Sequence, residues 1–157
     1  IIHARKGILK GLSPRQNRNI PPLNYQKVYS IKDDFPELEI IINGGIKNIS
    51  EAKNHLNYVD GVMLGRAAYD DPFMLSDIDS EIYSNTKIEI SRKDLLTEYL
   101  DYVHVMTKKG YDPKIMLKHV FGLKKGEKDA KRFRVKVAEI MNSSSLVENK
   151  DELLSMV

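Results

Sequence analysis

Two glycine turns, each at the end of an apolar run, are the residues best suited to bind a ligand. Ile42-Asn43-Gly44-Gly45 ends the first run, and Leu64-Gly65-Arg66 ends the second. Glycine lets the backbone approach a ligand closely, and the free N–H groups at a helix start attract anions, so both turns suit a phosphate group. In (β/α)₈ barrels such a site commonly follows the last two strands. Taken alone, the glycines could also serve only to make tight strand-to-helix turns.

His3 is the titratable side chain placed best for chemistry. It follows the apolar pair Ile1-Ile2, at the carboxyl end of a predicted strand, where barrel enzymes build their active sites. The basic pair Arg5 and Lys6 comes directly after it. A lone histidine on a strand can also be a structural residue, and this alternative stays open. The other histidines lack metal-ligand spacing, so we interpret them as structural or surface residues and predict no metal site: His55, His104 and His119.

The elements that must position these residues alternate between strand and helix. Short apolar runs at 1–4, 38–42 and 59–64 predict strands, which are separated by a long polar loop from Arg5 to Pro22 and by two helices. One helix is predicted over 25–34, with Asn24 as its N-cap, and the other from Ser50 to about Leu56. This alternation predicts an α/β fold with parallel strands, and three strands are only part of a closed barrel.

After about residue 79 the strand patterns stop and helical patterns take over. Ser91 and Asp94 resemble a capping box that opens a helix ending at Gly110. Further helices are predicted over 113–122, 129–141 and 150–157, the last after a polar linker at 142–145. We therefore divide the chain into a barrel portion, residues 1–78, and a small all-helical domain, residues 79–157.

Charge is distributed unevenly along the chain, although the net charge is only +3. Residues 1–32 carry seven Lys or Arg and no acidic residue, and residues 114–136 carry nine basic residues against two acidic ones. The segment 33–112 carries sixteen acidic residues against eight basic ones. The two basic blocks indicate surfaces for a polyanion, and solvated basic faces are an equal alternative from charge alone.

Several classes of protein are disfavoured by what the sequence lacks. It has no cysteine, so the chain supplies neither disulfides nor thiolate chemistry. It has no apolar stretch of about 18 residues and no signal-peptide pattern, so we expect no membrane span and a cytoplasmic location. Because it begins with Ile1 rather than Met, we expect a truncated chain that starts within a strand.

An ordered series of motifs resembles the A-type tRNA-dihydrouridine synthases. The series covers nearly seventy residues, so it is far more specific than one glycine motif, and the resemblance extends over most of the chain. It implies the C-terminal portion, about three strands, of a (β/α)₈ TIM barrel followed by a helical domain. The motifs are His3-Ala4-Arg5-Lys6, Lys10-Gly11-Leu12-Ser13-Pro14, Asn17-Arg18, Ile20-Pro21-Pro22-Leu23, Asn43-Gly44-Gly45-Ile46 and Asp60-Gly61-Val62-Met63-Leu64-Gly65-Arg66-Ala67-Ala68-Tyr69.

The resemblance also implies a role for each candidate site residue. His3 would donate to the flavin ring of FMN. The FMN phosphate would be held by Asn43, Gly44, Gly45, Gly65 and Arg66. The tRNA would be contacted by Arg15 and Arg18 in the first loop and by Lys131 and Arg134 in the helical domain. One departure concerns the turn before Ala130, where the family's Pro-Gly is replaced by Lys128-Asp129.

The activity implied is reduction of D-loop uridines of tRNA, at positions 20 and 20a, to 5,6-dihydrouridine. In the family NADPH reduces FMN, the flavin passes a hydride to the uracil, and a cysteine protonates it. Since this chain has no cysteine, we assign it no catalytic residue and place the general acid in the N-terminal half of the same enzyme. We expect this chain alone to be inactive and the full-length enzyme to be a monomer.

Two alternatives share some of these features. One is a different FMN barrel oxidoreductase that acts on a small molecule, such as a dihydroorotate or dihydropyrimidine dehydrogenase. It would need the phosphate glycines but not the basic loop or the helical tail. The other is a non-enzymatic RNA-binding remnant, which would need the basic blocks but not the flavin site.

Overall fold

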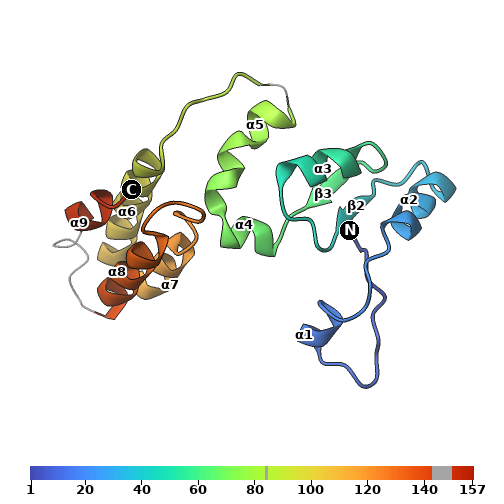
Figure 1. Ribbon diagram of the computed structural model, residues 1–157, viewed down its shortest axis with the longest axis horizontal. Helices are drawn as coiled ribbons and strands as arrows, with labels where there is room; N and C mark the ends of the chain where they lie inside the picture. The colour runs from blue at the N-terminus through green and yellow to red at the C-terminus, as the bar shows by residue number, and fades with distance from the viewer. Residues whose placement is uncertain (84, 143–149) are drawn as a thin grey trace. The chain divides into compact units, whose positions relative to one another are not determined.

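A computed structural model of the chain describes residues 1–83, 85–142 and 150–157. Contacts divide it into two units, Ile1–Ala67 and Ala68–Val157, whose helices and strands are labelled in Figure 1. Each unit has its own cluster of buried apolar side chains. This division falls before residue 78, where the sequence suggested a boundary between barrel and helical domain. The functional assignment of the two domains stays a prediction.

The first unit contains a parallel sheet of three strands in the order β1-β2-β3. The strands are β1 (Ile2–His3), β2 (Ile41–Asn43) and β3 (Gly61–Met63). The prediction of an α/β fold with parallel strands is therefore confirmed. Both β2 and β3 are shorter than the apolar runs that predicted them, because each strand begins later in the chain than its run. The backbone N–H of Ile40 donates to Asp60 Oδ2 at 2.8 Å.

Helix α2 (Tyr25–Asp34) begins as the sequence predicts. The Asn24 side chain caps it by accepting from the backbone N–H of Lys27 at 3.0 Å. Helix α3 (Ile49–Leu56) does not begin as predicted, since its N-cap is Asn48 rather than Ser50. Asn48 Oδ1 accepts from the backbone N–H of Glu51 at 2.8 Å, which leaves Ser50 inside the first turn. Asparagine and serine are both favoured at N-caps, and here the bonds between Asn48 and Glu51 place the cap at Asn48.

The long loop before α2 contains a short helix that the sequence patterns did not predict. Helix α1 (Pro14–Asn17) begins with a capping box in which Ser13 and Gln16 exchange side-chain and backbone hydrogen bonds. Asn17 then fastens the loop to itself, because its side chain accepts from the backbone N–H of Ile8 and donates to the Ile8 carbonyl. Residues 13–17 thus have a defined local structure within the loop.

One face of the sheet is buried and the other is not. Ile42 is fully buried with Val28 of α2 and Ala52 of α3 in the core cluster of this unit. Because side chains alternate along a strand, Ile41 and Asn43 lie on the opposite face, and neither they nor their partners in the register are buried. Helices α2 and α3 therefore contribute to the core on one face only.

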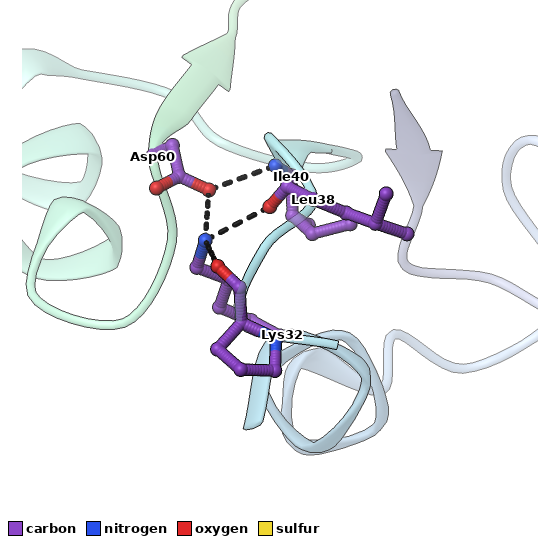
Figure 2. A network of polar contacts seen from close by, with 5 residues as sticks. Lys32, Leu38, Ile40 and Asp60 are labelled. Atoms are coloured by element: carbon purple, nitrogen blue, oxygen red, sulfur yellow. Dashed lines mark hydrogen bonds and ion pairs between the residues drawn. The ribbon is translucent and has the colours of Figure 1, made fainter. Parts of the chain in front are cut away.

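A polar network ties the amino ends of β2 and β3 to the end of α2 (Figure 2). Lys32 Nζ lies 2.8 Å from Asp60 Oδ2 and also donates to the carbonyls of Pro36, at 2.9 Å, and Leu38, at 2.8 Å. The same Asp60 oxygen accepts from the backbone N–H of Ile40. We call this set, Lys32, Asp60 and the backbone of residues 36–40, the lysine clasp. It joins three segments at the end of the sheet opposite the glycine turns.

In the second unit the described residues form helices and turns, with no strand among them. Helix α4 (Arg66–Asp70) begins in the first unit, and helix α6 (Arg92–Lys108) opens with the predicted Ser91–Asp94 capping box. The predicted linker at 142–145 lies outside the described residues except for Asn142, which belongs to α8. The remaining elements are η1 (Pro72–Asp77), α5 (Ile78–Glu81), α7 (Pro113–Leu117), η2 (Lys118–Val120), α8 (Ala130–Asn142) and α9 (Lys150–Leu154).

The core of the second unit is built where α6, α7 and α8 meet. Leu96 and Leu100 of α6, Leu117 of α7 and Phe133 of α8 are almost completely buried there. Gly122 allows a close approach at the edge of this core, because a Cβ at that position would lie 2.5 Å from the Asp70 carbonyl oxygen.

Candidate functional site

The site begins as a row of three side chains at the carboxyl ends of the strands. His3 of β1 is in register with Asn43 of β2, which is in register with Met63 of β3. Residues in register on parallel strands point to the same face, here the face that the core leaves uncovered. The Asn43 amide reaches across the row to the Met63 sulfur at 3.2 Å, a weak acceptor.

The turn after β2 needs its two glycines for the backbone itself. Gly44 and Gly45 have φ angles of +117° and +76°, which residues with a side chain rarely adopt. A Cβ at Gly44 would come within 3.0 Å of the His3 ring, and one at Gly45 within 2.5 Å of Leu23. The Tyr25 hydroxyl fixes the turn by donating to the Gly44 carbonyl at 2.9 Å. The glycines therefore hold the turn against His3.

Gly65, in the turn after β3, has no such structural reason to be glycine. Its φ angle is not in the left-handed region, and apart from its two neighbours in the chain no described residue has an atom within 4 Å of where its Cβ would be. It is exposed, and it directly precedes α4. A side chain here would enter open space beside the start of a helix, the space that a bound anion could fill.

His3 has a defined protonation state. The backbone N–H of Arg5 donates to His3 Nδ1 at 3.2 Å, so the neutral ring carries its proton on Nε2. Partial desolvation of the ring, followed by the positive charges of Arg5 and Arg66, lowers the pKa of His3 below its usual value of 6.5. At neutral pH the ring is therefore uncharged and offers one N–H donor on Nε2.

Arg5 holds the end of the long loop against the end of β1. It forms an antiparallel bridge with Leu23, and its Nε donates to the Pro21 carbonyl at 2.7 Å. One of its terminal nitrogens, Nη1, is buried and has no hydrogen-bond partner among the residues that the structure describes. A buried guanidinium donor without an acceptor is costly to the fold.

Arg66, at the start of α4, reaches back to the same loop. Its Nη1 donates to the Asn19 side-chain oxygen at 2.8 Å. Arg15 lies in α1 and Arg18 is its C-cap, and both side chains are exposed. The loop that carries these two basic residues is thus in contact with the arginine beside Gly65.

The two basic candidates of the second unit lie on one exposed face of α8. Lys131 and Arg134 are three residues apart, and both are exposed, while Phe133 between them is fully buried. Asp129, just before this helix, has a φ angle of +61°. It therefore adopts the left-handed conformation at the position where the family pattern has glycine, and aspartate tolerates that conformation better than most residues.

The structure thus brings the cofactor candidates and the loop candidates together in the first unit, whereas Lys131 and Arg134 belong to the second.

Three residues near the site were not assigned a role from sequence: Arg5, Asn19 and Met63. The strand period alone could have found Met63, which lies two residues after Gly61 on the same face as Asn43. The contacts of Arg5 and Asn19 depend on the path of the loop, which no sequence pattern gave.

His55 is structural, as interpreted from sequence. It is buried, its Nδ1 lies 2.6 Å from the Tyr29 hydroxyl, and its ring packs edge-on against Tyr25.

Within residues 1–83, 85–142 and 150–157, no group of three or more His, Cys, Asp or Glu could hold a metal ion. None of the helices described has the length and apolar character needed to cross a membrane.

These features describe an α/β protein with a candidate anion site at the carboxyl ends of parallel strands. The dihydrouridine synthase family model matches residues 1–156, so the chain belongs to the dihydrouridine synthase family. This result confirms the resemblance found in the motifs.

Relatives with known names are similar over most of this chain. It is 43% identical to the tRNA-dihydrouridine(20/20a) synthase of Pseudomonas putida over 133 residues, which cover 85% of this chain and 40% of that protein. Identity to the Haemophilus ducreyi protein of the same name is 43% over 139 residues, covering 88% and 43%. The Synechocystis protein of that name is 43% identical, with coverage of 85% and 40%. The chain therefore spans about two fifths of the length of these relatives.

Proposed function

We propose that the protein carrying this chain reduces uridines 20 and 20a in the D-loop of tRNA to 5,6-dihydrouridine, with FMN as cofactor and NADPH as reductant. Support comes from family membership and from the activity for which the similar proteins are named. The observation that carries the cofactor part is Gly65, a glycine that the described chain itself does not require. A cytoplasmic location is part of the same proposal.

In this proposal the two glycine turns hold the FMN phosphate. Gly44 and Gly45 form one side of this phosphate site, which we call the phosphate cradle, and Asn43 lies at its edge. On the other side Gly65 leaves room for the phosphate to approach the backbone closely. Arg66 supplies a charged donor, which suits the fork of a guanidinium to phosphate oxygens. The residues present fit the group, because both open space and positive donors meet at one end of the sheet.

The row of His3, Asn43 and Met63, which lies beside the glycine turns, supplies the polar contacts of the reaction site. FMN, when bound and reduced by NADPH, supplies the hydride for the uracil. His3 donates through Nε2, the nitrogen that its contact with Arg5 leaves protonated. The lowered pKa keeps His3 neutral, so it donates a hydrogen bond without adding a positive charge. No residue of this chain is assigned the proton donor, which in the proposal is a cysteine elsewhere in the protein.

The basic residues bind the tRNA in this proposal. Arg15 and Arg18 contact it from the first loop, and Lys131 and Arg134 contact it from α8. All four side chains are exposed, and they belong to the two stretches of the sequence that are richest in positive charge. Phosphate contacts of this kind supply most of the affinity for a nucleic acid.

We also propose that strands outside this chain complete a TIM barrel with β1, β2 and β3. Among the described residues no further strand pairs with the outer edges of β1 and β3, and the face that bears His3 is uncovered. The length of the relatives leaves room for the remaining strands and for the cysteine. The chain alone would then lack part of its active site and be inactive.

Substitution of Gly65 by alanine in the full-length protein tests the cofactor assignment. A Cβ at Gly65 meets no atom of the described chain, so the free energy of unfolding should change by no more than about 0.5 kcal/mol. FMN affinity should fall roughly tenfold or more, because the methyl group enters the space proposed for the phosphate. Quenching of flavin fluorescence measures the affinity, and chemical denaturation of the FMN-free protein measures the stability.

Gly7→Ala is the matched control. Gly7 also has an ordinary φ angle and nothing within 4 Å of its Cβ position, but it lies in the loop after β1. It should change neither stability nor FMN affinity. The assignment is wrong if Gly65→Ala binds FMN as tightly as Gly7→Ala does. Dihydrouridine content of tRNA after incubation with NADPH then tests the activity of the unmodified full-length protein.

A further inference from the structure

The contact between Asn19 and Arg66 joins two parts of the proposed site that have different ligands. Arg66 belongs to the proposed phosphate cradle, and Asn19 directly follows Arg18 in the proposed tRNA-binding loop. The two side chains lie 47 residues apart in sequence, yet they meet at 2.8 Å. The backbone of Asn19 is itself held, because its N–H donates to the Gln16 carbonyl at 3.0 Å.

This hydrogen bond orients the guanidinium group of Arg66. A guanidinium presents five donors in a rigid planar fork, so a bond at one nitrogen sets the directions of the others. Asn19 accepts through its side-chain oxygen and adds no charge that would compete with a phosphate. The remaining donors of Arg66 are thus fixed in direction without being neutralised.

The returning limb of the loop, residues 19–21, is held at two points by arginines. Arg66 bonds to the Asn19 side chain, and Arg5 bonds to the Pro21 carbonyl. Both arginines also act on His3, since their charges lower its pKa. The position of this limb, and with it of Arg18, therefore depends on residues of the proposed cofactor site.

We propose that Asn19 is a positioning residue for Arg66, and that their hydrogen bond couples binding of the FMN phosphate to the conformation of the tRNA-binding loop. This inference rests on the proposed function. A phosphate that fixes Arg66 also fixes Asn19, so less conformational freedom of the loop is lost when tRNA binds. By linkage the effect is reciprocal, and bound tRNA strengthens FMN binding by the same factor.

The test is a binding cycle with the full-length protein and unmodified tRNA. FMN affinity is measured by flavin fluorescence with and without tRNA, and tRNA affinity by filter binding with and without FMN. For the unmodified protein we expect each ligand to strengthen the other about fivefold or more. For Asn19→Ala we expect FMN to bind about threefold to tenfold more weakly without tRNA, and the coupling factor to fall to about one.

Three controls separate positioning from a general structural effect. Asn54→Ala removes an exposed asparagine of α3 that is outside the site, and it should behave like the unmodified protein. Riboflavin, which lacks the phosphate, should bind equally to Asn19→Ala and to the unmodified protein. Asn19→Asp should weaken FMN binding at least as much as Asn19→Ala, because a carboxylate occupies the Arg66 donors.

The outcomes distinguish this inference from the proposed function. If the unmodified protein binds neither FMN nor tRNA, the proposed function fails and the inference fails with it. If it binds both, but Asn19→Ala retains the coupling factor, or if riboflavin shows the same loss as FMN, then the proposed function stands and the role of Asn19 is wrong.

Discussion

The charge state of the His3 ring depends on the arginines around it. Its pKa is lowered first by burial and then by Arg5 and Arg66, so removal of one arginine should raise the pKa toward the usual value of 6.5. We expect Arg66→Gln to raise the pKa of His3 in the FMN-free protein. The measurement is a pH titration of the ring signals by NMR, with His3 assigned from the signal that disappears in His3→Asn.

Arg18→Gln is the matched control for this titration. Arg18 carries the same charge in the same unit, but it is not among the groups that act on His3. An unchanged titration of His3 in Arg66→Gln, or an equal upward change in both variants, would contradict the electrostatic role given to Arg66.

At the scale of single residues, the sequence could predict what depends on local chemistry. Asn24 and the Ser91–Asp94 pair were recognised as caps because their bonding is confined to a few neighbouring residues. The motifs gave His3 and the glycines, but not the Arg66–Asn19 bond, which needs the folded path of the loop. The missing glycine at Asp129 could be noticed from sequence, whereas its left-handed conformation could not.

At the scale of elements, the lysine clasp sets how the sheet responds to acid. Hydrogen bonds from Lys32 and from the backbone of Ile40 lower the pKa of Asp60 below its usual 3.8. A carboxylate whose pKa is lower in the folded state contributes stability that is present above the unfolded pKa. That contribution is lost as pH falls through the folded pKa. The first unit should therefore lose this stabilisation only below about pH 3.8.

Replacing Asp60 by asparagine tests this contribution. We expect Asp60→Asn to unfold at a lower denaturant concentration than the unmodified protein at pH 7, and the difference to shrink as pH falls below 3.8. Glu37→Gln, an exposed carboxylate nearby in sequence, should have a smaller effect. A difference between Asp60→Asn and the unmodified protein that stays constant from pH 7 to pH 2 would show that the charge of Asp60 is not the cause.

Most elements could be predicted from the sequence, but several of their ends could not. The alternation of strand and helix in the first unit followed from apolar spacing, as did the helices of the second unit that include α6, α7 and α8. The start of α3 was wrong because two good caps, Asn48 and Ser50, stand close together, and side-chain bonds to Glu51 and Lys47 favour the first. Helix α1 was missed because its four residues are too few to show a helical period.

At the scale of the whole protein, the two basic blocks predict how the proposed tRNA binding depends on salt. Removal of one phosphate-binding side chain should reduce the slope of log affinity against log salt concentration by about one. We expect Arg18→Ala and Lys131→Ala each to have this effect on the full-length protein. Lys27→Ala, an exposed lysine of α2 in the first basic block, should have less effect.

This measurement also separates the proposed function from the alternatives. A barrel oxidoreductase for small molecules should show no tRNA binding of this kind. An RNA-binding remnant should show the salt dependence but bind no FMN. Equal slopes for Arg18→Ala, Lys131→Ala and Lys27→Ala would mean that the positive charge attracts RNA without specific contacts at the proposed residues.

The lysine clasp has a consequence for how such a protein can evolve. It lies at the amino ends of β2 and β3, while the glycine turns and His3 lie at the carboxyl ends. Because the residues that fasten the strands are separate from those proposed to contact a ligand, mutations in the loops at one end should leave the contacts at the other intact. The sheet can therefore tolerate drift in specificity over generations without first losing its architecture.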